Sequence, residues 1–274
     1  MKKEIVVEKK DKVILLADKI CYWQRPDWCE GRYRQLNFSL MKPRYHYEYD
    51  TNEKYPLILW ITGGSFIEED INIWMPEMVY FAKHGYAVAG VDYSINARTR
   101  FPMQLEDIKA CIRYIRAHAE ELHIDPEKIV IMGESAGGYF SALTALTGAD
   151  RRYDKGDFLE FSSAVSAAVP WYPPCDMTKM DLEHAGDIAA DITKYPNLAL
   201  LPDKNTPPFL ILHGTGDTLV SYHQGEMLYE ALEKAGVPAD LVLIKGANHA
   251  DHYFIQDEVK EMILKFFDSV LYNK

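Results

Sequence analysis

Short apolar runs alternate with longer amphipathic segments from Pro56 onward. The short runs are rich in β-branched and aliphatic residues, as buried strands are. We expect strands at Leu57–Ile61, Ala87–Asp92, Ile129–Met132, Ala164–Val169, Phe209–His213 and Asp240–Ile244. This alternation predicts an α/β fold in which helices cover both faces of a mostly parallel sheet.

The longer segments repeat apolar side chains every three or four residues, as the buried face of a helix does. In the clearest case, Pro102–Leu122, the stripe contains Leu105, Ile108, Ile112 and Ile115. Further helices are expected at Tyr139–Thr147, Tyr222–Ala235 and Ile255–Leu271.

The first 55 residues have another pattern. Ile20–Gln24 and Tyr33–Met41 are rich in aromatic side chains, and we expect them to pair as antiparallel strands at the edge of the sheet. Residues 173–208 contain more Pro, Asp and Lys and little periodicity, which favours a small cap or lid there. Since no Gly/Ser/Pro-rich linker divides the chain, residues 1–274 are expected to form a single domain with that insertion.

The composition limits the partners of the protein. A chain of 274 residues with 48% hydrophobic residues can bury a large core. Its formal net charge of −11 would repel a phosphate backbone, so nucleic acid is not an expected partner. The apolar stretches are too short to cross a bilayer, so no membrane partner is expected either. Whether the protein forms a homo-oligomer is left open by the sequence.

The N-terminus and the cysteines indicate the compartment. Met1-Lys2-Lys3 is like the basic start of a signal peptide, but Glu4–Glu8 lacks the apolar run that would follow. The four cysteines are widely spread without a Cys-x-x-Cys pair, which favours free thiols over a disulfide framework. They are Cys21, Cys29, Cys111 and Cys175. We therefore expect a cytoplasmic location.

A candidate nucleophile lies in Gly133-Glu134-Ser135-Ala136-Gly137, which matches Gly-x-Ser-x-Gly between an expected strand and an expected helix. In a sharp strand-to-helix turn, side chains two residues before and two residues after the serine would collide, so both positions need glycine. The serine hydroxyl then lies above the sheet, and the start of the helix directs its amides to where negative charge develops. An ordinary glycine-lined turn is the alternative.

A second glycine-containing loop, Thr62-Gly63-Gly64-Ser65-Phe66, follows the expected strand that ends at Ile61. Glycines let backbone amides approach a substrate oxygen, and an oxyanion loop is expected at this place in the chain. The amide of Ala136 would supply a further donor. A Gly-Gly pair alone is also compatible with a flexible turn.

A serine hydroxyl needs a base within hydrogen-bond reach. His249 follows the last expected strand, on the same strand-end side as Ser135. His213 ends an expected strand and His252 is expected to start the last helix, so both are alternatives as supporting residues. Three other histidines are expected on helices, as solvated or capping residues: His84, His118 and His123.

The base in turn needs a carboxylate on its other nitrogen. Asp217, just beyond the penultimate expected strand, is the candidate, because the order Ser, Asp, His is typical of such sites. Its rivals in the expected cap region are Asp176, Asp181 and Asp203. The spacing of His249, Asp251 and His252 would also suit a metal, but no further ligand cluster lies near it in sequence. Neither a metal nor a cofactor is therefore expected.

With these residues the chain resembles the esterase/lipase branch of the α/β-hydrolases, which includes hormone-sensitive-lipase-like enzymes and small bacterial carbohydrate and feruloyl esterases. The resemblance covers roughly Pro56–Lys265 and is most specific from Val91 to Gly138. It implies an α/β-hydrolase fold, a triad of Ser135, Asp217 and His249, and oxyanion amides on Gly64, Ser65 and Ala136. In one departure, Thr62-Gly63-Gly64-Ser65 stands where the family usually has His-Gly-Gly-Gly.

The expected reaction is hydrolysis of short acyl esters through an acyl-enzyme, with acetylated or feruloylated carbohydrates as candidate small-molecule substrates. Phe66, Trp171 and Tyr172, near expected strand ends, are candidates to line the pocket, although they fit the core equally well. An amidase or aryl formamidase with the same triad is an alternative. A binding protein that has lost the reaction is another.

Overall fold

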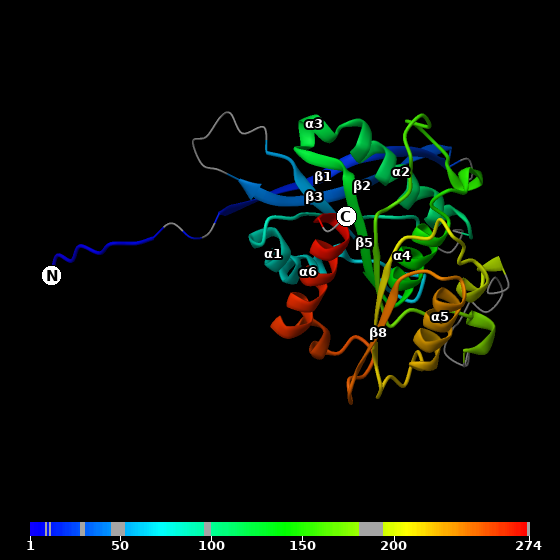
Figure 1. The fold of residues 1–274 in the computed structure, drawn as a ribbon. Helices are drawn as coiled ribbons and strands as arrows, with labels where there is room; N and C mark the ends of the chain where they lie inside the picture. The colour runs from blue at the N-terminus through cyan, green and yellow to red at the C-terminus, as the bar shows by residue number, and fades with distance from the viewer. Residues whose placement is uncertain are drawn as a thin grey trace.

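The computed structural model describes residues 1–8, 10, 12–27, 31–44, 53–95, 100–180 and 194–272. Eight strands in these ranges form one sheet in the order β1-β2-β4-β3-β5-β6-β7-β8 (Figure 1). β1 (Val13–Asp27) pairs antiparallel with β2 (Arg32–Arg44), and β2 pairs antiparallel with β4. The other pairs are parallel. Their strands are β3 (Tyr55–Ile61), β4 (Ala87–Val91), β5 (Ile124–Glu134), β6 (Ala168–Trp171), β7 (Phe209–Gly214) and β8 (Ala239–Ile244).

The central strands are continuous apolar runs because both faces of the sheet are covered. Every residue of β3 is buried, and successive side chains point to opposite faces. Leu57 and Leu59 therefore belong to one hydrophobic cluster, whereas Ile58 and Trp60 belong to another. The sheet separates two cores and contributes side chains to each.

Helices cover these two cores from opposite sides (Figure 1). Apolar residues of α1 (Met75–Lys83) and α6 (Asp257–Tyr272) lie in the core with Trp60. Those of α2 (Met103–Ala117), α4 (Ala136–Leu146) and α5 (His223–Lys234) lie in the core with Leu59. The remaining short helices are η1 (Ile71–Ile73), α3 (Ala119–Leu122), η2 (Arg151–Tyr153), η3 (Met177–Lys179), η6 (Leu198–Leu200) and η7 (His252–Ile255).

The predicted α/β fold with antiparallel strands at its N-terminal edge is confirmed. Several details differ from the expected elements: among them, β1 and β5 extend beyond the expected strands. The helix expected at Pro102–Leu122 divides at His118 into α2 and α3, and the strand expected at Ala164–Val169 runs from Ala168 to Trp171. Helix α1, which follows Trp74, was not among the expected helices.

The described parts of the expected cap, residues 173–180 and 194–208, are tied to the helices beneath them. The Tyr139 hydroxyl of α4 donates to the Pro196 carbonyl at 2.8 Å. Gln224 of α5 accepts hydrogen bonds from the amides of Cys175 and Asp176, both at 2.8 Å. Residues 181–193 lie outside the described residues, so the cap insertion stays a prediction.

Cys21, Cys111 and Cys175 are free thiols, whereas Cys29 lies outside the described residues. None of the described helices is both long enough and apolar enough to span a membrane.

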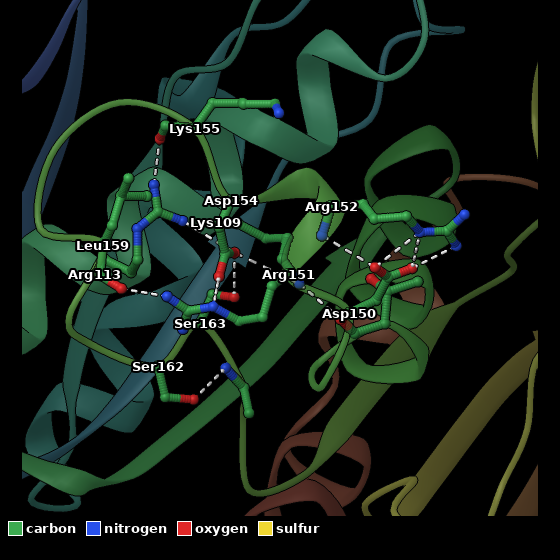
Figure 2. A network of polar contacts seen from close by, with 12 residues as sticks. Lys109, Arg113, Asp150, Arg151, Arg152, Asp154, Lys155, Leu159, Ser162 and Ser163 are labelled. Carbon is green, nitrogen blue, oxygen red and sulfur yellow. Dashed lines mark hydrogen bonds and ion pairs between the residues drawn. The ribbon is translucent and has the colours of Figure 1, made fainter.

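A group of charged side chains, buried except for that of Arg151, joins α2 to the segment after α4 (Figure 2). We call it the Asp154 cluster, and it consists of Asp154, Lys109, Arg113, Arg151 and Ser163. Asp154 lies 3.1 Å from Arg113, 3.0 Å from Arg151 and 3.8 Å from Lys109, and it accepts a hydrogen bond from Ser163 at 2.7 Å. The side chains of Lys109 and Arg113 are fully buried. One carboxylate thus faces three cations.

The cations of the Asp154 cluster also donate to backbone carbonyls. Lys109 donates to Thr147 at 2.6 Å, and Arg113 donates to Lys155. Arg151 donates to Phe161 at 3.1 Å. These bonds fix a segment without regular strands against the helical layer, since each buried donor has an acceptor.

Candidate active site

Ser135 lies at the turn where β5 ends and α4 begins. Its φ of 54° and ψ of −121° are costly for a residue with a side chain, and such values persist only where the surroundings determine them. A Cβ on Gly133 would lie 2.6 Å from the Gly137 carbonyl oxygen, and a Cβ on Gly137 would lie 2.0 Å from that of Ile61. Both positions need glycine, but the closest approach at each is to the backbone of Ile61 in β3 and not only to the other side of the turn.

Ser135, His249 and Asp217 form a hydrogen-bonded chain. Nε2 of His249 lies 2.9 Å from the Ser135 hydroxyl, and Nδ1 lies 2.8 Å from a carboxylate oxygen of Asp217. Asp217 follows β7 and His249 follows β8, so loops at the carboxyl ends of neighbouring strands bring them together. Nδ1–H donates to the acid, which leaves Nε2 to accept from the serine.

Asp217 is held from several directions. Its other oxygen accepts from the amides of Leu219 at 2.9 Å and Val220 at 2.8 Å. Nε2 of His213 lies 3.6 Å from the carboxylate and 2.8 Å from the Val220 carbonyl. Burial alone would raise the pKa of Asp217, but hydrogen bonds from His213 and His249, the charge of His249 and the Val220 amide lower it overall. Asp217 is therefore a carboxylate at neutral pH.

The other candidate histidines lie elsewhere. His213 is buried in β7 as a supporting residue beside Asp217. His252 does not start the last helix, because it lies in η7, ahead of α6. His84, His118 and His123 are the C-cap residues of α1, α2 and α3.

The two described rival carboxylates bind groups within the expected cap region. Asp176 caps η3 by accepting from the Thr178 amide at 3.1 Å, and Asp203 accepts from the Asn205 amide at 2.8 Å. Asp181 lies outside the described residues. Within the described ranges, no group of three or more His, Cys, Asp or Glu side chains has the arrangement of a metal site.

The predicted oxyanion loop passes beside Ser135. Gly64, Ser65 and Phe66 have φ values of 132°, 52° and 65°, three successive positive values. Gly64 and Ser65 line the same pocket as Ser135, and Ala136 directly follows the serine. These positions suit three converging amides, although their part in an oxyanion hole stays a prediction.

Thr62 and Phe66 fix the two ends of this loop. The Thr62 hydroxyl accepts from the indole N–H of Trp60 at 3.0 Å, and its carbonyl accepts from the Tyr93 hydroxyl at 2.7 Å. The Phe66 ring packs at centroid distances of 5.5 Å from Phe140 and 5.2 Å from Tyr195. Thr62, which replaces the family's usual histidine, is thus an internal anchor of the loop.

A pocket of about 480 Å³ opens above Ser135 and His249. It is lined by Thr62, Gly63, Gly64, Ser65, Glu68, Glu69, Asp70, Ile73, Trp74, Glu134, Ser135, Leu219, His249 and Ala250. Four of these described residues are acidic and none is Lys or Arg. Burial, together with the nearby charge of Asp92, raises the pKa of Glu69 to about 8. The pocket wall is therefore negative or neutral.

The aromatic residues proposed for the pocket require correction. Trp171 and Tyr172 are fully buried and pack in the core with Phe254, and Phe66 packs against α4. None of the three lines the pocket. Trp74 does, at the start of the unpredicted helix α1. The local sequence carried no signal for this, because neighbours distant in sequence decide the exposure of a tryptophan.

The strand order, the strained serine turn and the Ser135–His249–Asp217 chain define an α/β-hydrolase fold. The chain belongs to the BD-FAE family, whose model matches residues 45–232.

Comparisons with individual proteins agree with this class. The chain is 30% identical to the probable carboxylic ester hydrolase LipM of Mycobacterium tuberculosis over 65% of its own length and 45% of LipM. It is similar in structure to a truncated carbohydrate esterase from gut microbiota, with a TM-score of 0.75, 22% identity and coverage of 96% and 98%. Thermogutta terrifontis esterase 2 phosphorylated by paraoxon gives a TM-score of 0.76 at 24% identity, with coverage of 93% and 94%.

The chain spans about half the length of the named relatives that it matches. The two structural similarities, each below 25% identity, concern the fold.

Proposed function

We propose that the protein is a serine carboxylic-ester hydrolase that works through an acyl-enzyme. One observation carries the proposal: the hydroxyl of Ser135, the imidazole of His249 and the carboxylate of Asp217 are linked at 2.9 Å and 2.8 Å beside a pocket. A nucleophile, its base and an orienting acid are the groups that acyl transfer requires.

In the proposed reaction His249 takes the proton of Ser135 as the serine oxygen attacks the ester carbonyl. The amides of Gly64, Ser65 and Ala136 stabilise the resulting oxyanion. When the intermediate collapses, the carbon–oxygen bond to the alcohol breaks, and His249 gives its proton to the leaving oxygen. A water molecule then attacks the acyl-serine by the same steps, which releases the acid and restores Ser135.

For the substrate we propose a short-chain acyl ester of a neutral, hydroxyl-rich alcohol, such as an acetylated carbohydrate. Carboxylates at the pocket accept hydrogen bonds from hydroxyl groups, and Trp74 offers a ring face for stacking. Glu68 and Asp70 would repel an anionic alcohol or acid. The similarity to a carbohydrate esterase supports the same class.

Acetyl release from 4-nitrophenyl acetate tests the reaction. We expect an initial burst of 4-nitrophenol at one equivalent of enzyme, and labelling of Ser135 by a fluorophosphonate. Ser135→Ala should abolish both, whereas Ser269→Ala, a change on the exposed side of α6, should alter neither. Full turnover by Ser135→Ala would refute the assignment, and failure of the wild type to react with the probe would favour a binding protein.

A substrate panel tests the finer assignment. Acetylated xylo-oligosaccharides, feruloylated sugars and N-formylkynurenine are compared by kcat/KM. We expect the acetylated sugars to lead. A clear preference for N-formylkynurenine would instead indicate an aryl formamidase with the same triad.

The free thiols Cys21, Cys111 and Cys175 support a reducing compartment, and the cytoplasm remains our proposal for the location.

A further inference from the structure

Glu134 is a buried carboxylate at the pocket that the proposed reaction does not use. It precedes Ser135, has only 6% of its surface exposed and lines the pocket. Its Oε1 accepts a hydrogen bond from the backbone amide of Gly63 at 2.5 Å. Glu134 thus connects the strand that carries the nucleophile directly to the loop proposed to bind the oxyanion.

The contact between Gly63 and Glu134 is tight. A Cβ on Gly63 would lie 2.6 Å from both Oε1 and the backbone carbonyl oxygen of Glu134. Real side chains do not tolerate such distances, so glycine is required here for close approach and not for an unusual φ. The Glu134 carboxylate can therefore occupy this position only because residue 63 has no Cβ.

The loop that follows needs such an anchor. Ser65 and Phe66 both have positive φ values, which cost of order 1–3 kcal/mol each for residues with a side chain. Contacts at the ends must therefore hold the loop in this conformation. Phe66 is fixed by its aromatic neighbours, and Thr62 by Tyr93, whereas Gly63 is fixed by Glu134. The amides of Gly64 and Ser65 lie between these fixed points.

Burial raises the pKa of Glu134, while the Gly63 amide and the nearby His249 act in the opposite direction by favouring the ionised form. The contact with Gly63 needs only an acceptor oxygen, which an ionised and a neutral carboxyl group both supply.

We propose that Glu134 is a positioning residue: through the Gly63 amide it holds the Gly64 and Ser65 amides where the oxyanion develops. The proposal rests on the function given above, since it assigns an effect on the same reaction. It predicts that the loss of the acceptor, and not the loss of the charge, impairs the chemical step.

The kinetic test compares Glu134→Gln, which keeps an acceptor oxygen, with Glu134→Ala, which removes it. We expect Glu134→Ala to lower kcat on 4-nitrophenyl acetate by about 10- to 100-fold with KM changed less than about threefold, as misplaced oxyanion donors do. Glu134→Gln should recover most of that loss. The matched control is Glu106→Ala, which removes another carboxylate that is 8% exposed, paired with Arg25 and outside the pocket. Its kcat should stay at the wild-type value.

Two kinetic results would overturn the proposal: an unchanged kcat in folded Glu134→Ala, or an equal loss in Glu134→Gln and Glu134→Ala. The second result would show that charge near His249 matters instead.

A second measurement does not depend on turnover. In ¹H–¹⁵N correlation spectra the Gly63 amide proton should resonate at low field in the wild type and in Glu134→Gln. In Glu134→Ala this proton resonance should move upfield, together with the amide proton resonances of Gly64 and Ser65. Unchanged resonances would contradict the positioning role even if the protein hydrolysed no ester. Failure of Ser135 to react with a fluorophosphonate would instead contradict the proposed function, so the two failures are distinguishable.

Discussion

Asp154 and Asp217 are both buried carboxylates that face basic side chains. They differ in which basic side chains face them, and therefore in the role that each can have. In the Asp154 cluster, one carboxylate with 2% of its side chain exposed faces three cations. Asp217, whose side chain is fully buried, faces two imidazoles. Each is also fixed by further hydrogen bonds, Asp154 from Ser163 and Asp217 from backbone amides.

The side chains that face each carboxylate account for the difference between Asp154 and Asp217. Lysine and arginine remain charged at neutral pH, and in the Asp154 cluster their other donors end on backbone carbonyls. An imidazole is the side chain whose charge can change near neutral pH. The imidazole of His249 contacts the Ser135 hydroxyl beside the pocket. The charged groups of the Asp154 cluster, which lie outside the pocket, hold segments together, whereas an imidazole beside the pocket can move a proton.

The largest expected effect belongs to Asp217→Asn. It keeps the shape of the side chain but removes the charge that orients and stabilises His249, so kcat/KM should fall by about 10⁴-fold, as in other serine hydrolase triads. Ester hydrolysis under substrate-limited conditions measures it. A loss below tenfold would mean that Asp217 acts like Asp154, as a structural residue.

Asp154→Asn should show the opposite profile. Removal of the single carboxylate leaves the buried cations unpaired, which costs about 3–5 kcal/mol of unfolding free energy. Urea denaturation measures that loss, and kcat/KM per folded molecule should stay near the wild-type value. A large loss of kcat/KM in folded protein would show that the cluster is coupled to the pocket.

A smaller effect concerns pH. Since the native pKa of Asp217 lies below its ordinary value, its ionisation stabilises the fold above about pH 4, and this contribution decreases as the pH falls below that value. The unfolding free energies of wild type and Asp217→Asn should therefore converge between pH 7 and pH 3. A difference that stays constant over this range would contradict the lowered pKa.

The smallest expected effect is that of Lys109→Met. Burial lowers the pKa of Lys109 to about 8, so its charge opposes folding, and its replacement should change the unfolding free energy by less than about 1.5 kcal/mol at pH 7. Above pH 8 native Lys109 loses its proton before the unfolded chain does, so the wild type should gain stability relative to the variant up to about pH 10.4. A wild-type unfolding free energy that falls relative to that of Lys109→Met above pH 8 would contradict this prediction.

The sequence predicted the elements whose pattern is local. The glycines on both sides of Ser135 were visible in the motif, although the backbone that they approach most closely is that of Ile61 in β3, and the strands of the parallel sheet are continuous apolar runs. Asp217 and His249 could be chosen because parallel strands place their carboxyl ends at one edge of the sheet. For these features, chain order carries the spatial information.

Features that depend on packing were less accessible. Nothing local distinguishes Trp171, which is fully buried, from Trp74, which lines the pocket, because neighbours distant in sequence decide their exposure. The position of Glu134 in the motif was visible, but its contact with Gly63 depends on how β3 lies beside β5. Helix α1 was missed although Met75, Met78 and Phe81 repeat at helical spacing.

Strands β6 and β7 lie between β5, which carries the nucleophile, and β8, which precedes the base. The Ser135 amide donates to the Trp171 carbonyl of β6 at 3.0 Å, and the Tyr172 amide donates to the Leu212 carbonyl of β7 at 2.7 Å. Hydrogen-bonded main chains about 4.8 Å apart therefore set the distance between Ser135 and the loop that carries His249. Because every residue type except proline supplies the same main-chain N–H and C=O groups, interior side chains can change while the reacting atoms keep their separation.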